Sequence, residues 1–170
     1  MNLKVRAGLA AMLLLCSLGA TALADEDAGD APQYKVLKAR SAAPKDADIN
    51  PAVTLGALLS QSGEHDWSAD KAARIDGFVV QVEQEPDGDM HLVLASAAHE
   101  PDTRKWVVVE VPRAVRDRHK SMSPAALRKL VGKAVRVTGW LYWEPDEQSE
   151  DPRGTRWELH PVTSIDAPGP

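Results

Sequence analysis

The sequence predicts a mainly β domain, a five-stranded OB-fold-like Greek-key barrel with a short N-terminal accessory helix. Three observations lead to this fold class. Five segments between residues 75 and 165 have strand-like patterns, and one helical segment lies between the third and the fourth. Gly77 and Gly139 fall inside strands, where a small barrel must bend sharply. The order β-β-β-α-β-β is that of the OB-fold, and its single helix favours this barrel over a β-sandwich or an SH3-like barrel.

The first 24 residues have the three parts of a secretory signal peptide. Lys4 and Arg6 carry the positive charge, residues 9–18 form the apolar stretch, and small residues lead to a cleavage site after Ala24. The apolar stretch is too short to span a bilayer comfortably, so we expect it to be removed, which leaves no transmembrane segment. The mature protein would be periplasmic or secreted. Cys16 would be lost as well, which excludes disulfides, a thiol nucleophile and a thiolate metal site.

The rest of the chain is predicted to form one domain, monomeric by default. Residues 25–48 are rich in Ala, Asp, Lys and Pro without periodicity, which indicates a flexible lead-in. The domain would cover residues 49–166, and residues 167–170 would form a tail. Asn50 and Pro51 can cap and begin the accessory helix, which would end near residues 62–63.

The strands follow in order after the accessory helix. Alternating apolar residues begin at Ile75 and stop at the turn Glu85-Pro86-Asp87-Gly88, which predicts the first hairpin. A helix would begin at Ser123-Pro124 and end at Gly132, because proline favours a helix start and glycine a helix end. The remaining strands are expected at residues 90–95, 105–111, 134–143 and 156–165.

Charge is distributed unevenly along the chain. The formal charge is −5, and it becomes −7 once Lys4 and Arg6 are removed, which disfavours a general nucleic-acid binder. Residues 113–136 form a basic segment that contains only one acid, Asp117. Its basic residues are Arg113, Arg116, Arg118, Lys120, Arg128, Lys129, Lys133 and Arg136. These cations would bind an anionic partner, pair with the protein's own acids, or stay solvated.

The loops that usually bind ligands on OB-folds are acidic in this chain. The two connections carry Glu83, Glu85, Asp87 and Asp89 on one side, and Glu144, Asp146, Glu147, Glu150 and Asp151 on the other. Such an acidic rim would repel phosphate backbones and would suit a cationic ligand, a divalent ion or a basic partner surface. The alternative is a solvated acidic surface without a ligand.

Two acid-x-His pairs are the strongest chemical signal. Asp89-x-His91 and Glu158-x-His160 have the i, i+2 spacing that places both side chains on one strand face. Imidazole and carboxylate together are common ligands of divalent transition metals, so these four groups, with Glu110 as a further candidate, could hold a metal if the two strands lie close. Otherwise they line a solvated face or form a structural hydrogen-bond network. The candidate ligand-binding residues are Asp87, Asp89, His91, Glu110, Glu158 and His160.

Signatures of familiar enzymes are absent from the sequence. It contains no Gly-rich phosphate loop, nucleophile-elbow serine or H-E-x-x-H motif, so catalytic residues are not assigned. Five tryptophans are more typical of core filling, although Trp140 and Trp143 fall on opposite strand faces and one could stack on a ligand. The favoured interpretation is an exported binding module whose acidic rim engages a cationic or small-molecule ligand or a basic protein partner. The alternatives are a metal-dependent hydrolase at the acid-x-His pairs and nucleic-acid binding through residues 113–136.

Four segments together carry a resemblance that covers residues 75–165. They are Asp87–Ala95 (DGDMHLVLA), Val109–Pro112 (VEVP), Val135–Gly139 (VRVTG) and Trp157–Ile165 (WELHPVTSI). The chain resembles a group of small exported bacterial proteins of uncharacterised function with DGDxHLxLA and ELHPV motifs. The resemblance implies an export signal and a compact β domain, but no established activity.

Overall fold

The computed structural model of the chain describes residues 36, 40, 42–60, 67, 71–144 and 154–167. The predicted signal peptide, most of the predicted lead-in and most of the acidic loop after residue 144 lie outside the described residues. In the described part, no helix is long and apolar enough to cross a membrane.

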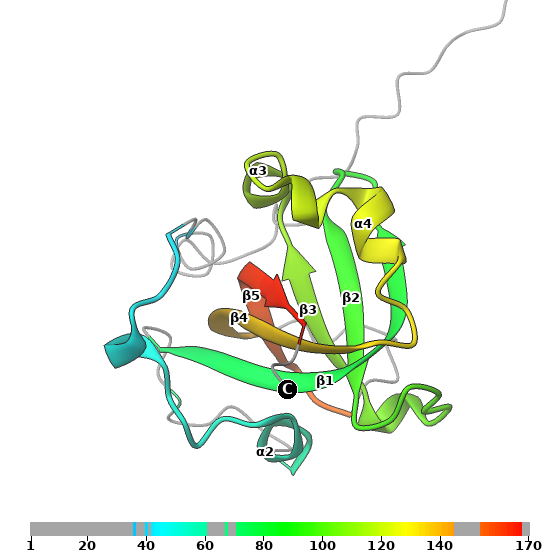
Figure 1. The fold of residues 1–170 in the computed structure, drawn as a ribbon. Coiled ribbons are helices and arrows are strands. Elements are labelled where there is room, and N and C mark those ends of the chain that lie inside the picture. The colour runs from blue at the N-terminus through cyan, green and yellow to red at the C-terminus, as the bar shows by residue number, and fades with distance from the viewer. Residues whose placement is uncertain are drawn as a thin grey trace, which may run out of the picture.

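Five strands close into one barrel, which confirms the predicted fold class (Figure 1). Going round the barrel, the order is β1, β2, β3, β5 and β4, and β4 pairs with β1 to close it. All pairings are antiparallel except that of β3 with β5. The strands are β1 (Ala72–Gln84), β2 (Met90–Ala95), β3 (Val107–Val111), β4 (Ala134–Trp143) and β5 (Trp157–Asp166).

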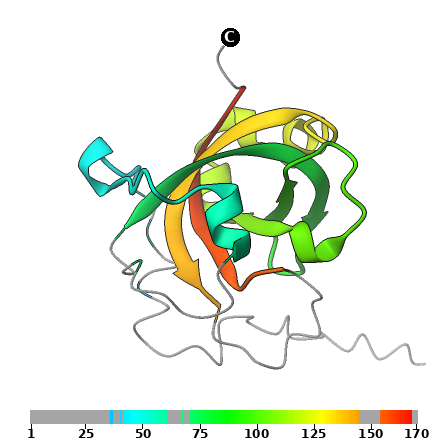
Figure 2. The same cartoon turned by 90° about the horizontal axis from the view of Figure 1, so that it is seen from below.

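Short helices cover both ends of the barrel. Figure 1 shows α3 and α4 over one end and α2 at the other, and Figure 2 looks onto the α2 end. Leu58 of α2 and Leu127 of α4 are fully buried in the barrel core, so the interior is packed rather than open. The helical elements are η2 (Asp46–Asp48), α2 (Leu55–Ser60), η3 (Thr103–Lys105), α3 (Arg113–Arg116), η4 (Lys120–Met122) and α4 (Pro124–Arg128).

Alternation along the strands decides which side chains face the core. Met90, Leu92 and Leu94 of β2 have no exposed surface, and each such burial stabilises the fold by roughly 1.5–3 kcal/mol. His91 lies between Met90 and Leu92 and is directly opposite Glu110 of β3 in the strand register. The same alternation that fills the core therefore places these two polar side chains on the outer face.

A β-bulge in β1 changes the phase of the predicted alternation. The pairing of β1 with β2 shifts between Val79 and Gln81. Val79 is fully buried, yet Val82 also packs against the core although the two are three positions apart. The extra residue lets both valines face inward, and bulges of this kind also bend a strand around a barrel.

Several element boundaries differ from the sequence-based expectation. Strand β1 begins at Ala72 rather than Ile75, because its first residues pair with β4. The cap expected at Asn50 is wrong: its side chain accepts a bond from Ala52 in a turn, while Thr54 Oγ1 accepts from the Ala57 amide in α2.

Gly139 lies where β4 and β5 are too close for a side chain. A Cβ at this position would lie 2.9 Å from the Pro161 carbonyl oxygen and 3.1 Å from Leu159 Cβ. We expect Gly139→Ala to lower the free energy of unfolding by about 1–3 kcal/mol, because this overlap forces the strands apart. Urea unfolding measures this change in free energy. Gly56→Ala in α2 is the control, with an open Cβ position and an expected stabilisation of about 0.5–1 kcal/mol. Equal effects of both changes would contradict this packing.

Candidate functional site

The candidate site lies on the outer face of strands β2, β3 and β5. The two acid-x-His pairs lie on β2 and β5, which are not neighbours because β3 lies between them. Glu110 of β3 is paired with His91 of β2, and β3 runs parallel to β5 with Val109 opposite Leu159. Glu110 therefore occupies the position that joins the two predicted pairs.

Glu110 forms hydrogen bonds with two histidines. Its Oε2 atom lies 2.9 Å from Nε2 of His91, and its Oε1 atom lies 2.7 Å from Nε2 of His160. An ionised carboxylate only accepts hydrogen bonds, so both Nε2 atoms carry a proton and donate. Only about 5% of Glu110 and 4% of His160 are exposed, so this His91–Glu110–His160 network is largely shielded from water.

His91 is held between two carboxylates. Besides Glu110, its other ring nitrogen lies 3.4 Å from Glu85 Oε1. Burial alone would lower the pKa of His91, but the hydrogen bond and charge of Glu110, together with the charges of Glu158 and Glu85, raise it to about 9. The ring of His91 is therefore a cation at neutral pH.

Glu110 is ionised because the two histidines stabilise its negative charge. Its burial would raise the pKa of the carboxyl group, but the charges and hydrogen bonds of His160 and His91 lower it well below its usual value. The site thus contains a buried carboxylate even in mildly acidic solution.

Glu158 adds a second buried carboxylate beside the network. One potential ligand atom from each of Glu110, Glu158 and His160 lies within 4.8 Å of the others, and all three side chains are buried. Tyr142 of β4 is opposite Glu158 in the register and packs edge-on against the His160 ring, with 5.7 Å between centroids. The Nδ1 atom of His160 has no hydrogen-bond partner among the described residues.

The two aspartates of the β1–β2 turn have structural partners. Asp87 is exposed, and its Oδ1 atom accepts a bond from the Asp89 amide at 2.9 Å. Asp89 Oδ1 accepts from the Arg113 amide at 2.6 Å, where α3 begins. Burial raises the pKa of Asp89 to about 6 despite that backbone bond, and the charges of Glu110 and Asp87 act in the same direction. Of the predicted metal ligands Asp89, His91, Glu158 and His160, only the last two belong to the group of three.

Arg116 is a positioning residue that the sequence-based reasoning missed. It was counted with the basic segment, but its side chain is only 9% exposed and donates to the Gly88 carbonyl oxygen. Gly88 has a positive φ of 100°, which glycine adopts readily in a turn. Arg116 and the Asp89–Arg113 bond together hold the turn against α3. No local pattern could have shown this, because the partners are separated by 28 positions.

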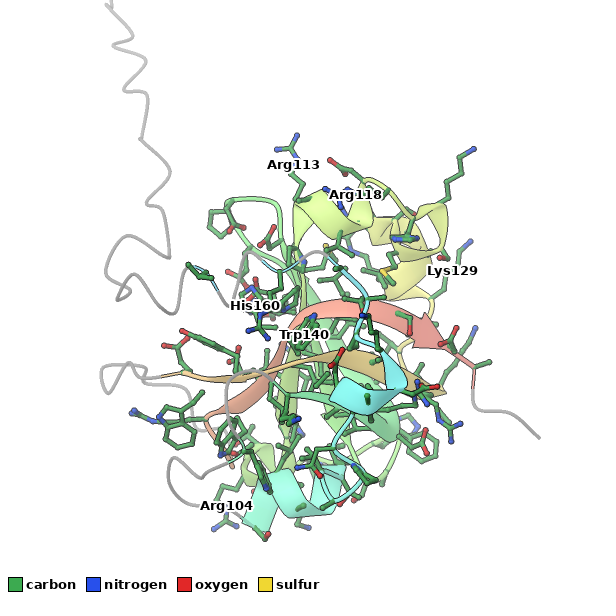
Figure 3. All side chains as sticks on the ribbon, turned by 90° about the vertical axis from the view of Figure 1, so that its left-hand side faces the viewer. Arg104, Arg113, Arg118, Lys129, Trp140 and His160 are labelled. Carbon is green, nitrogen blue, oxygen red and sulfur yellow. The ribbon has the colours of Figure 1, made fainter. Side chains whose placement is uncertain are left out.

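The rest of the basic segment lies at the surface. Arg136 binds both carboxylate oxygens of Asp76, at 2.7 and 2.9 Å, so it is paired within the protein. Figure 3 shows Arg113, Arg118 and Lys129 at the α3–α4 end of the barrel, at a distance from His160. The basic surface and the His91–Glu110–His160 network are therefore separate features.

The predicted acidic rim is described only in part. Glu83 and Glu85 lie at the β1–β2 end, and Glu144 directly follows β4. The acids at 146, 147, 150 and 151 lie outside the described residues. Only the β1–β2 half of the rim can therefore be related to the site.

The predicted ligand-stacking tryptophans have internal contacts. Trp140 Nε1 donates to the Ala42 carbonyl oxygen, and the Arg40 guanidinium lies 4.5 Å from the centre of its ring. Trp143 packs edge-on against Trp157, with ring centroids 5.3 Å apart. These contacts agree with packing rather than with a ligand-stacking platform.

A surface hollow of about 430 Å³ lies elsewhere, between α2 and β1. Its charged lining residues are Arg74 and Asp76, and each is paired, with Asp46 and Arg136 respectively. The hollow therefore lacks the convergent titratable groups of the His91–Glu110–His160 network.

Comparison with known proteins adds no assignment: no protein-family model matches the chain, and no curated protein matches it. The resemblance to small exported bacterial proteins thus stays a prediction, and the function has to be argued from the site.

Proposed function

We propose that the protein is an exported, OB-fold-like binding module whose ligand is a cation, bound at the outer face of β2, β3 and β5. The observation that carries this proposal is the buried carboxylate of Glu110, which bridges two histidines and has further acids beside it. OB-folds commonly bind ligands on the face of their second and third strands, and His91 and Glu110 lie on that face.

The charge balance favours a cation over an anion. Glu85, Glu110 and Glu158 all act on His91, and Asp89 lies close enough to Glu110 for its pKa to respond. The described side chains of this network thus include four carboxyl groups and two histidines. A negative excess in a poorly solvated site is costly unless a cation neutralises it.

The exposure of the side chains indicates from which side a ligand would reach the site. His91 and Glu85 have side chains that are 22% and 27% exposed, whereas Glu110 is 6% exposed. A cation would therefore approach past Glu85 and His91 to reach the buried carboxylates. The proposed function predicts that ligand binding depends on the inner acids more than on the exposed rim.

A binding experiment with matched variants tests this proposal. Titration calorimetry with divalent metal salts, spermidine and arginine methyl ester should detect one bound cation per chain. Glu158→Gln should weaken that binding at least tenfold, because it removes an inner charge. Asp166→Asn, at an exposed acid at the far end of β5, should change it by less than twofold. No binding of any cation, or equal weakening by both variants, would contradict the proposal.

Metal-dependent hydrolysis is the second candidate, favoured by the number of donor groups. Catalytic zinc sites commonly keep three protein ligands and leave one position open, and three donors converge here. Hydrolysis of ester and phosphoester substrates that requires added metal and is lost in Glu158→Gln would support it. An oligonucleotide affinity that falls steeply with salt would instead support the basic segment as the binding surface.

A further inference from the structure

We infer that the bound cation is a single divalent transition-metal ion of the Zn²⁺ type, ligated by Glu110, Glu158 and His160. This inference rests on the proposed function, because it names the cation of that same site. The ligand set differs from the one expected from the sequence. Glu110 is now a ligand, and Asp89 and His91 are not.

The donor atoms suit such an ion. One ring nitrogen and two carboxylate oxygens lie within 4.8 Å of one another. Ligand bonds of about 2.0–2.2 Å in a tetrahedral site bring ligand atoms to about 3.5 Å from one another, so the side chains need only small movements. A nitrogen donor favours zinc and its neighbours over calcium and magnesium, which prefer shells made of oxygen ligands.

Burial restricts the size of the ligand. Glu158 and His160 are each about 4% exposed, and Glu110 is about 5% exposed. A polyamine or a peptide side chain cannot contact all three groups without displacing what covers them. A metal ion is small enough to occupy the space between them.

The hydrogen bonding of His160 provides a second, independent observation. Its Nε2 atom donates to Glu110, but its Nδ1 atom has no partner among the described residues although the ring is buried. A purely structural histidine at this depth would be expected to satisfy both nitrogens, and buried polar atoms without partners often mark the place of a water or an ion. The bond to Glu110 therefore satisfies only one of the two ring nitrogens of this buried histidine.

The other oxygen of Glu110 is already fixed. His91 Nε2 holds Oε2 at 2.9 Å, which leaves Oε1 directed at His160. Hydrogen bonds of this kind commonly orient the carboxylates that bind metals. An ion bound by Oε1 and by His160 Nε2 would take the place of the Nε2 proton, which the imidazole can carry on Nδ1 instead.

Zinc titration of the purified, chelator-treated protein tests the inference at pH 7.5. We expect one Zn²⁺ per chain, bound at least tenfold more weakly by Glu158→Gln and by His160→Gln. The controls are Asp166→Asn and His119→Gln, which remove an exposed acid at the far end of β5 and an exposed histidine and should leave the affinity unchanged. Far-UV circular dichroism and urea unfolding of each variant show whether it is folded.

The unmodified protein gives a measurement that needs no variant. Co²⁺ bound in place of Zn²⁺ should show the intense visible absorption of a four-coordinate site with nitrogen and oxygen ligands. Ca²⁺ or Mg²⁺ binding as tightly as Zn²⁺, or only organic cations binding, would overturn this inference and leave the proposed function intact. Failure of every cation to bind would overturn both.

Discussion

Glu110→Leu should lower the free energy of unfolding at pH 7 by about 3–5 kcal/mol, the largest effect we expect from one substitution in the network. The change removes the acceptor of both histidines, and it leaves the charge of His91 largely buried with only Glu85 in direct contact. Urea unfolding at fixed pH measures the loss.

A matched variant at an exposed acid shows how much of the lost stability comes from breaking the network and how much from removing any one charge. Asp166→Leu removes an exposed acid at the end of β5 and should change the unfolding free energy by about 0.5 kcal/mol or less. Replacing His91, Glu110 and His160 together by apolar residues should recover most of the stability, because no buried charge then lacks a partner. If Glu110→Leu were no more destabilising than Asp166→Leu, the bridging role of Glu110 would be wrong.

Raising the pH from 6.5 to 9 should lower the unfolding free energy by about 3 kcal/mol through His91 alone. Its pKa rises from an ordinary 6.5 to about 9 on folding, chiefly because the interaction with Glu110 outweighs the cost of burial. The folded state therefore keeps a proton that the unfolded state has released. This stabilisation is fully present below pH 6.5 and is lost as the pH passes 9.

Urea unfolding at several pH values measures this dependence. His91→Gln should remove most of it, whereas His119→Gln, at an exposed position, should retain it. The raised pKa of Asp89 acts at lower pH, since its folded state favours the protonated carboxyl and loses stability as the pH rises toward 6. A flat profile between pH 6.5 and 9 in the unmodified protein would contradict the charged state assigned to His91.

Two strands were predicted with their exact bounds. The bounds of β2 and β4 agree with the sequence-based ranges, because a turn or a glycine precedes each strand. The bulge in β1 was not predicted, since an extra residue becomes visible only when the partner strand is known. Helix α3 was also missed: four residues give no helical period, and its first amide is capped by Asp89 from the preceding hairpin.

The sequence predicted the residues of the site but not that Glu110 links the two histidines. The i, i+2 spacing placed His91 and His160 each on a strand face, which is a local property of β-structure. That Glu110 joins them depends on the parallel pairing of β3 with β5, a contact across 50 positions of sequence. The burial of Arg116 beneath the turn depends on tertiary packing in the same way.

Proton–nitrogen correlation spectra of the histidine side chains, recorded at pH 7.5 before and after one equivalent of Zn²⁺, test the central claim most directly. The account predicts that His91 carries protons on both ring nitrogens in the metal-free protein. It further predicts that zinc shifts a nitrogen of His160 to a ligated value, while the exposed His99 and His119 do not change. A neutral His91 together with an unchanged His160 would contradict both the buried network and its role as a cation site.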